Sequence, residues 1–233
     1  KIHRARAFAE AVLRNWYERE NGNYSRASPP ARLGEGGEIA VLRAGVEEEM
    51  REMKTYLPQT WTDPRIEFRK SRISGDGMFA REPFNKGEVV CIVGGMVMTD
   101  SEFAAFQATH ALYNSIQIDK NLHLVEDPEI TRSLDGSMNH SCDSSAWMDD
   151  EVTLVARRDI ESGEEVTVDY ALFTTQSNWM LDNRCHCGSP HCRRTITGDD
   201  WRRNDVQERY RNHFSPFINR RIERLMKGSL YDI

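Results

Sequence analysis

Three short segments carry the residue types with which this chain could do chemistry. Residues 139–142 read Asn-His-Ser-Cys, residues 169–170 read Asp-Tyr, and residues 185–192 hold cysteines in a Cys-x-Cys-x4-Cys pattern. Together with Cys142, about forty residues earlier, these cysteines supply four thiolates, the number that closes a tetrahedral structural zinc site. The sequence therefore indicates a metal that ties two distant segments together beside a polar pocket containing an aromatic residue.

The cysteine usage favours a reducing compartment. The chain has five cysteines, an odd number, and three of them fall within residues 185–192, which is typical of an intracellular metal site rather than a disulfide framework. His186 and His191 flank the thiolates and are the alternative zinc ligands if Cys142 stays outside the site. Cys91 lies in an apolar run and is most simply a buried free cysteine.

Composition and charge exclude several classes of protein. The 233 residues are 39% hydrophobic and 29% charged, which is ordinary for a globular chain with a sizeable core. A net charge of -6 argues against a protein that grips nucleic acid through a broad basic face. No apolar run approaches the ~20 residues that span a bilayer, and no secretory leader is visible. We expect an intracellular, soluble protein, cytoplasmic or nuclear, that binds neither membranes nor nucleic acid directly.

Two helical patterns precede the chemically interesting segments. Apolar residues recur at three- and four-residue steps over residues 1–20 and again over residues 39–57. Residues 21–37 contain Asn-Gly, Pro-Pro and Gly-Gly pairs, which indicate a loop or hinge. The second pattern favours a helix packed on its own domain, and a homodimer formed through these helices is the alternative.

From residue 66 the chain has the texture of a small β domain. Short apolar runs alternate with glycine turns, and only residues 101–113 favour a helix in this part. After the cysteines, Asp199 or Asp200 can cap one helix, and Ser215-Pro216 can open another. We therefore predict an α+β, mostly β fold with N-terminal and C-terminal helices. The expected strands are residues 66–68, 78–80, 89–93, 96–98, 116–118, 151–156 and 165–168.

The order of the motifs resembles one known family. Glycine motifs at residues 75–77 and 94–95 precede Asn-His-Ser-Cys, then Asp-Tyr, then the cysteine cluster. In this arrangement residues 66–196 resemble the SET domain of S-adenosylmethionine-dependent lysine methyltransferases, with a cysteine-type post-SET segment. The Asn-His-Ser-Cys and Asp-Tyr motifs, about 28 residues apart, are the specific part of the likeness, and the glycine motifs only support it.

The resemblance implies roles for the matching residues. In this family the glycine turn and the Asn-His pair hold S-adenosylmethionine, and the segments with the two specific motifs pass through one another as a pseudoknot. Tyr170, brought next to the sulfonium, would be the catalytic residue that orients the amine. Asp169 would fix the knot by hydrogen bonds, and we interpret His140 as a structural histidine bonding across the knot rather than a general base. The implied cofactor-binding residues are Gly75, Asp76, Gly77, Met78, Asn139, His140, Tyr170 and His186, and the implied zinc ligands are Cys142, Cys185, Cys187 and Cys192.

The resemblance also implies a domain order and an activity. The expected segments are an N-terminal helical segment at residues 1–64, a SET domain at residues 65–183, a post-SET zinc segment at residues 184–197 and C-terminal helices at residues 198–233. The expected reaction transfers a methyl group from S-adenosylmethionine to the ε-amine of a protein lysine. The alternative is a SET-fold protein that methylates a small molecule, or that binds the cofactor without transferring methyl.

Two positions depart from the family pattern. Many members have Tyr-x-Gly where residues 93–95 read Val-Gly-Gly, so an expected channel tyrosine is absent, and Tyr113 is the candidate to replace it. Val168 stands two residues before Tyr170, where relatives often carry a Phe or Tyr that tunes the number of methyl groups added. The sequence therefore leaves the acceptor and the degree of methylation open.

Overall fold

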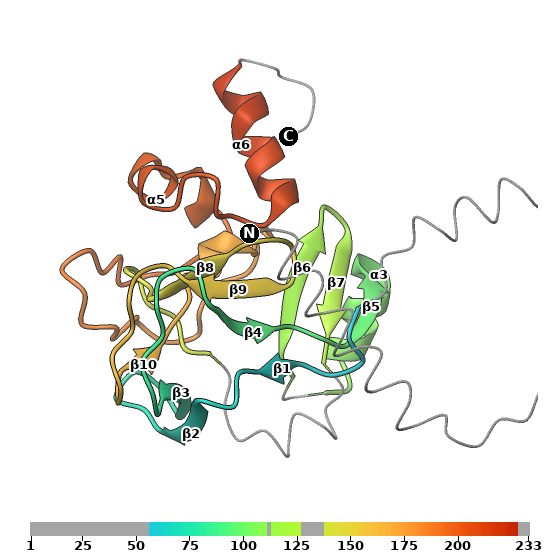
Figure 1. Cartoon of the computed structure of the whole chain (residues 1–233). Coiled ribbons are helices and arrows are strands. Elements are labelled where there is room, and N and C mark those ends of the chain that lie inside the picture. The colour runs from blue at the N-terminus through green and yellow to red at the C-terminus, as the bar shows by residue number, and fades with distance from the viewer. Residues whose placement is uncertain (1–55, 111–112, 127–137, 228–233) are drawn as a thin grey trace, which may run out of the picture. The chain divides into compact units, whose positions relative to one another are not determined.

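A computed structural model describes residues 56–110, 113–126 and 138–227 (Figure 1). The helix predicted for residues 1–20, most of the one predicted for residues 39–57, and the dimer contact expected of them lie outside this part of the chain. Within the described ranges, no helix is long and apolar enough to cross a membrane.

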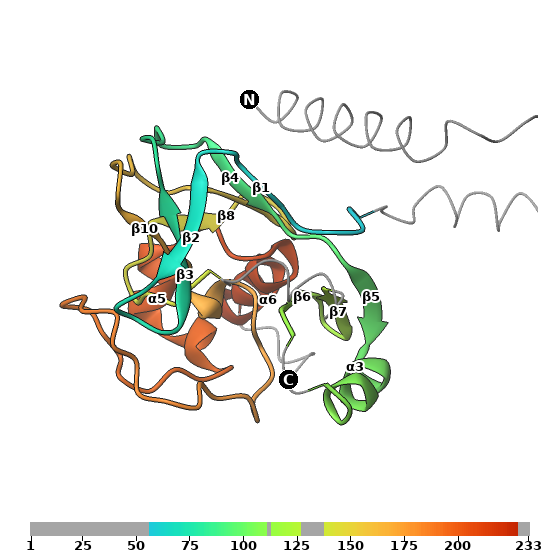
Figure 2. The ribbon, with the colours of Figure 1, turned by 90° about the horizontal axis from the view of Figure 1, so that it is seen from below.

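Three small antiparallel sheets form the framework of the molecule (Figures 1 and 2). The first has the order β1 (Trp61–Thr62), β4 (Val89–Ile92), β9 (Thr153–Ala156) and β8 (Ala146–Met148). The second is β10 (Glu165–Val166), β3 (Asp76–Ala80) and β2 (Ile66–Lys70). The third is β5 (Met96–Thr99), β7 (Leu122–Val125) and β6 (Ser115–Asp119). Short strands with few helices confirm the predicted α+β, mostly β fold class.

The β2–β3 hairpin positions the glycine motif of residues 75–77. The two strands pair in register from Ile66 opposite Ala80 to Lys70 opposite Asp76. Gly75 closes the connecting turn with a φ of +46°, a left-handed conformation that glycine adopts without steric cost. The hairpin therefore presents the backbone of residues 74–77 at the end of the second sheet.

The third sheet carries the helix that interrupts the β-rich region. Helix α3 (Asp100–Gln107) begins at Thr99, which forms a reciprocal capping box with Glu102. It lies against β5 and β7 (Figure 2). The helix predicted over residues 101–113 is thus real but shorter. After its end, the N–H groups of Thr109 and His110 both donate to the Phe106 carbonyl at 3.1 Å.

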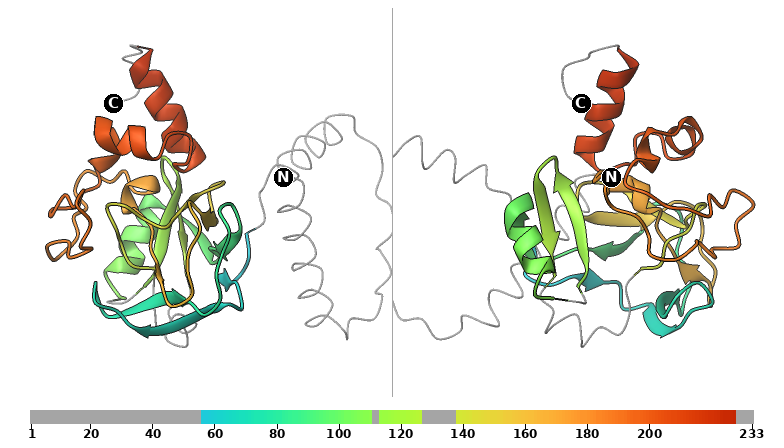
Figure 3. Two further views of the ribbon diagram at one scale, coloured as in Figure 1. Left: turned by 60° about the vertical axis from the view of Figure 1, so that its left-hand side comes forward. Right: turned by 180° about the vertical axis from the view of Figure 1, so that it is seen from behind.

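The C-terminal segment folds on one side of the sheets (Figures 1 and 3). It contains a short 3-10 turn, η2 (Asp200–Arg202), then α5 (Asn204–Arg209) and α6 (Pro216–Met226). Pro216 occupies the first turn of α6, as Ser215-Pro216 predicted. Trp201 and Tyr210 are buried beneath these elements, so the segment belongs to the core rather than to the surface.

One predicted helix start is wrong. We expected Asp199 or Asp200 to cap a helix running through Tyr210, but Asp199 makes no side-chain capping bond. The Asp200 carboxylate instead binds Arg193 at 2.7 Å. The chain then becomes extended at Arg203, with φ −72° and ψ 132°, before α5 starts. A buried ion pair has therefore taken the group that local propensity assigned to capping.

Candidate functional site

The two specific motifs lie side by side in the structure. His140 pairs in parallel with Val168. The Val168 N–H donates to the Asn139 carbonyl at 3.1 Å, and the Ser141 N–H donates to the Val168 carbonyl at 3.0 Å. The Tyr170 N–H completes the contact by donating to His140 Nδ1 at 3.2 Å. The fold therefore joins Asn-His-Ser-Cys and Asp-Tyr into one unit, which is the contact that the resemblance implies.

His140 is a buried imidazole with both nitrogens engaged. Its Nδ1 accepts from Tyr170, and its Nε2 lies 3.3 Å from Cys142 Sγ. Burial lowers the pKa of His140 to about 4, against the opposing influence of the Asp169 carboxylate. The ring is therefore neutral at physiological pH and has no ring nitrogen directed at a reacting group. This geometry supports the interpretation of His140 as a structural residue.

The Asn139 side chain binds the glycine turn. Its Nδ2 donates to the Ser74 carbonyl at 3.0 Å, the Asp76 carbonyl at 3.2 Å and Glu165 Oε1 at 2.8 Å. A Cβ added at Gly77 would lie 2.3 Å from Glu165 Oε1 and 3.1 Å from Asn139 Nδ2. Gly77 is therefore required here for close packing, and Asn139 links the two segments that the sequence assigned to cofactor binding.

Glu165 and Asp76 also contribute to this contact. Glu165 holds the Asn139 amide and also accepts from the Ser71 hydroxyl at 2.8 Å, yet no role was predicted for it. Its only sequence signal is its place at the start of the predicted strand of residues 165–168. The Asp76 carboxylate points away to the Lys70 ammonium at 2.9 Å, so the turn offers the Asp76 backbone to this contact rather than its side chain.

Tyr170 begins the short 3-10 helix η1 (Tyr170–Leu172) and is held on several sides. Its hydroxyl donates to the Met138 carbonyl at 3.1 Å. Its ring packs edge-on against Trp179, with centroids 6.0 Å apart, and beside Phe173, at 5.8 Å. Burial, together with charge at Cys185, raises the pKa of Tyr170 to about 12. The phenol is therefore neutral and fixed in one orientation.

A cavity of about 410 Å³ opens beside Tyr170. Val93 and Val168, the two positions that depart from the family pattern, both line it, and so does Tyr113. The Tyr113 hydroxyl accepts from Gln107 Nε2 at 2.7 Å, and its ring packs edge-on against Phe103. Tyr113 is thus placed where it can compensate for the missing channel tyrosine. Polar residues line the cavity as well, among them Gln107, Asn114, Gln117, His123 and Glu126.

The predicted cofactor-binding residues divide into two groups around this cavity. Met78 and Tyr170 line it. The glycine turn and the Asn-His pair form the hydrogen-bonded unit that supports it. His186 belongs to neither group and is exposed in the cysteine loop. The assignment of all these residues to the cofactor stays a prediction.

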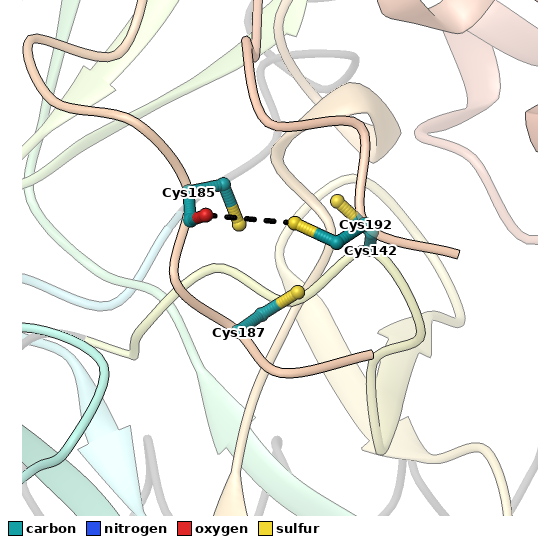
Figure 4. Close-up of side chains that lie close together, drawn as sticks. All are labelled: Cys142, Cys185, Cys187 and Cys192. Atoms are coloured by element: carbon teal, nitrogen blue, oxygen red, sulfur yellow. Dashed lines mark hydrogen bonds between the residues drawn. The ribbon is translucent and has the colours of Figure 1, made fainter. Parts of the chain in front are cut away.

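Four cysteine side chains converge from segments far apart in the sequence (Figure 4). Their sulfur atoms all lie within 4.8 Å of one another. Zinc bonded to four thiolates at about 2.3 Å would place the sulfur atoms about 3.8 Å apart, so the residues fit such a site. Neither predicted alternative ligand, His186 or His191, belongs to the group. The group comprises Cys142, Cys185, Cys187 and Cys192.

The thiols of this cluster differ in their ease of ionisation. Burial raises the pKa of Cys142 to about 12 and also raises that of Cys185. Burial opposes ionisation of Cys187 too, but hydrogen bonds from its surroundings outweigh that effect and lower its pKa to about 7. A bound divalent cation would favour the thiolate at all four positions. Zinc uptake should therefore release protons.

The cysteine cluster packs against the wall of the cavity. Cys142, Cys185 and Ile196 form a buried apolar group that Trp179 covers, and Trp179 in turn lines the cavity beside Tyr170. Arg193, which directly follows the last cysteine, is a further contact that the sequence did not reveal. Its guanidinium binds Asp169 and Asp200, each at 2.7 Å. The candidate metal centre is therefore joined to the tyrosine site by packing and by charge.

Comparisons with known proteins found similar sequences. Residues 75–171 match the model of the SET domain. The chain is 30% identical over 164 residues to "Histone-lysine N-methyltransferase ATX2" of Arabidopsis thaliana, a match covering 63% of this chain and 14% of that protein. It is 28% identical over 139 residues to "Probable histone-lysine N-methyltransferase set-23" of Caenorhabditis briggsae, covering 52% and 56%.

A solved structure is also similar. The methyltransferase domain of human "Histone-lysine N-methyltransferase SETMAR" has 21% sequence identity and a TM-score of 0.43, over 56% of this chain and 57% of that one. The chain thus spans 14% of the length of the plant relative and about half the length of the nematode protein and of the human domain.

Proposed function

We propose, from the match of residues 75–171 to the model of the SET domain, that the chain is an S-adenosylmethionine-dependent protein-lysine N-methyltransferase. The observation that carries the proposal is the position of Tyr170. Its ring forms part of the cavity wall, while its backbone is bonded to His140, next to the Asn139 amide that holds the glycine turn. Tyr170, a residue of the cavity wall, is thereby connected through His140 and Asn139 to the glycine turn, which binds the cofactor in this family.

The acceptor must reach the cavity as a neutral amine. A lysine ammonium has a pKa of about 10.4 and no lone pair, so it must lose a proton before it can be methylated. Transfer into a partly apolar cavity favours the neutral form because desolvation penalises charge. The aromatic walls provided by Phe173, Trp179 and Tyr113 suit the aliphatic part of a lysine side chain.

The role of Tyr170 follows from its hydrogen bond. Because its proton is donated to the Met138 carbonyl, the lone pairs of the phenol oxygen stay available to the acceptor amine and to positive charge. S-adenosylmethionine supplies a methyl group on a positively charged sulfur, which needs no strong general base. Tyr170 therefore acts by orientation and by electrostatic stabilisation of the transition state. Gly75, Gly77 and Asn139 would hold the cofactor beside it.

Zinc has a structural role in this proposal. Cys142, Cys185, Cys187 and Cys192 would close a four-thiolate site, which ordinarily has no open position for catalysis. With the metal bound, the segment of residues 185–192 would be fixed against Cys142 and would hold Trp179 at the cavity. The metal thus supports the wall of the acceptor site and takes no part in methyl transfer.

We infer that the acceptor is a protein. The named relatives are histone-lysine methyltransferases, which makes histones the first candidates. The net charge of -6 favours a basic partner of that kind. Homodimerisation through the N-terminal helices, the absence of direct nucleic-acid binding and an intracellular location remain predictions of the sequence.

The experiment is methyl transfer from a radiolabelled donor. The purified chain is incubated with histones, ribosomal proteins and a cell lysate, and the products are separated by mass. We expect label in polypeptides, and loss of most of it with Tyr170→Phe. Label in low-mass products would instead support small-molecule methylation, and the proposal fails if no polypeptide is labelled.

A further inference from the structure

We propose that Arg193 is a positioning residue that couples the cysteine cluster to Tyr170, so that metal binding and cofactor binding support each other. The inference deepens the proposed function and rests on it, because it assumes zinc at the four cysteines and S-adenosylmethionine beside Tyr170. Arg193 itself touches neither the cavity nor a reacting group among its described contacts.

The connection between Arg193 and Asp169 is bidentate and buried. Arg193 Nη1 binds Asp169 Oδ2 and Nη2 binds Asp169 Oδ1, both at 2.7 Å. The arginine side chain is 2% exposed and the aspartate side chain 0%. Two parallel charge-assisted bonds fix direction as well as distance, so the position of Asp169 follows that of Arg193.

Asp169 transmits this constraint to the catalytic segment. It lies between Val168, which pairs with His140, and Tyr170. Its Oδ1 also accepts the Ala171 N–H at 3.1 Å and so begins the η1 turn that carries Tyr170. A shift of the Asp169 carboxylate would therefore rotate the start of η1 and move the phenol.

Arg193 also contacts the cysteine cluster and the turn that follows it. It follows Cys192 in the chain, and its backbone N–H donates to Cys142 Sγ at 3.3 Å. Its Nε binds Asp200 Oδ2 at 2.7 Å. Hydrogen bonds to thiolate ligands help to set metal affinity. The backbone of Arg193 thus contacts two ligand cysteines, while its side chain binds a C-terminal turn and the Asp-Tyr motif.

A purely structural ion pair is the competing explanation. In that case Arg193 would stabilise the fold, and its replacement would reduce activity only by reducing the amount of folded protein. Arg193→Lys separates the two explanations because it keeps the charge but cannot reproduce the planar fork. Arg194→Lys is the matched control, since Arg194 is the neighbouring residue and is exposed.

The experiment measures zinc affinity by competition with a chelator, with and without saturating S-adenosylhomocysteine. Coupling between two sites must be reciprocal. In the original chain and in Arg194→Lys we expect zinc to bind at least about fivefold tighter when the nucleoside is present. In Arg193→Lys the ratio should fall close to one. A ratio that stays near fivefold in Arg193→Lys, or that equals one in the original chain, overturns the inference.

Turnover provides a second readout on the same proteins. For zinc-loaded, folded Arg193→Lys we expect kcat to fall at least about tenfold, with KM for the acceptor within about threefold. An unchanged kcat overturns the inference. If Arg193→Lys does not fold, Asp169→Asn tests the same pair while leaving the Arg193–Asp200 bond in place, and the same loss of coupling is expected. The original chain could bind S-adenosylhomocysteine in calorimetry and transfer methyl groups, yet show no effect of the nucleoside on zinc affinity. That result would refute this inference and leave the proposed function standing.

Discussion

At the scale of single residues, the Tyr170 hydroxyl is the group on which the proposed chemistry most depends. Tyr170→Phe removes the phenol oxygen but keeps the ring contacts with Phe173 and Trp179. We expect kcat/KM to fall about 100-fold or more, as for other preorganised electrostatic groups. Affinity for S-adenosylhomocysteine, measured by calorimetry, should change by less than about threefold. Retention of normal turnover would remove Tyr170 from the mechanism.

The pH dependence of turnover follows from the same residue. Burial raises the pKa of Tyr170 to about 12, so the phenol stays neutral through the working range. The acceptor amine, with a pKa of about 10.4, becomes more available as pH rises. We therefore expect kcat/KM to increase about tenfold per unit between pH 7 and pH 9. A bell-shaped profile with its maximum below pH 8 would show that an enzyme group titrates instead.

Gly77 tests the contact between the glycine turn and Asn139. Gly77→Ala would place a Cβ 2.3 Å from Glu165 Oε1 and 3.1 Å from Asn139 Nδ2, so both side chains would have to move. We expect calorimetry to show at least about tenfold weaker S-adenosylhomocysteine binding. Gly163→Ala is the control, because a Cβ added at Gly163 would meet no atom within 4 Å. Its φ of +84° makes this substitution costly for stability, so the two variants separate a loss of stability from a loss of binding.

The sequence identified those candidate site residues whose side chains are rare and chemically distinctive. Four cysteines with ligand spacing and a tyrosine in an Asp-Tyr motif were visible in the sequence, and the structure brings the four thiols together. Glu165 and Arg193 were missed because their roles depend on partners far along the chain. A glutamate that binds a distant asparagine and one that faces solvent look alike in a sequence.

At the scale of elements, the cysteine loop should depend on the metal. Cys187→Ser removes one of four converging sulfur ligands, and we expect zinc content to fall from about one per chain to well below it. Trp179, which packs on this cluster, should then become more mobile, and limited proteolysis within residues 181–198 should quicken. Metal analysis that still gives full occupancy, or a zinc-free protein that folds normally, would contradict the assignment.

Several of the short strands could not be predicted from the sequence. β7 (Leu122–Val125) escaped notice because its histidine is buried between apolar neighbours, which breaks the expected alternation. β1 and β8 are two and three residues long, too short for any periodicity. The hairpin of residues 66–80 was easier, because a glycine turn separates two clear apolar runs. Whether each short run becomes a strand was decided by tertiary pairing.

At the scale of the whole described molecule, the C-terminal helices are bonded to the segment that follows Cys142. The Tyr210 hydroxyl accepts from Ser144 N–H at 3.1 Å and from Ser144 Oγ at 3.3 Å, two residues beyond Cys142. Tyr210→Phe would leave the buried Ser144 N–H without its acceptor, while the Ser144 hydroxyl keeps its bond to the Ala146 carbonyl at 2.8 Å. We expect the free energy of unfolding, measured in urea, to fall by about 1–3 kcal/mol. Turnover at saturating substrates should be unchanged. A loss of activity without a loss of stability would mean that these helices serve the site directly.

The arrangement of motifs in space could not be derived from residue patterns alone. Parallel pairing of His140 with Val168 joins segments 28 residues apart, and the strands predicted between them do not specify this partner. It was expected only because the motif order resembles a family with a pseudoknot. The acceptor also lies beyond sequence reasoning, since the cavity is shaped by residues from several separate elements, among them Val93, Tyr113 and Trp179.

The most direct test of the central claim is the chemical identity of the product. The chain is incubated with histones and a donor carrying a deuterated methyl group, the protein is hydrolysed, and ε-N-methyl-lysine is quantified by mass spectrometry. We predict deuterated methyl-lysine in the original chain's reaction and a fall of about 100-fold or more with Tyr170→Phe. Absence of deuterated methyl-lysine, or equal amounts with the two proteins, would contradict lysine methylation at this site.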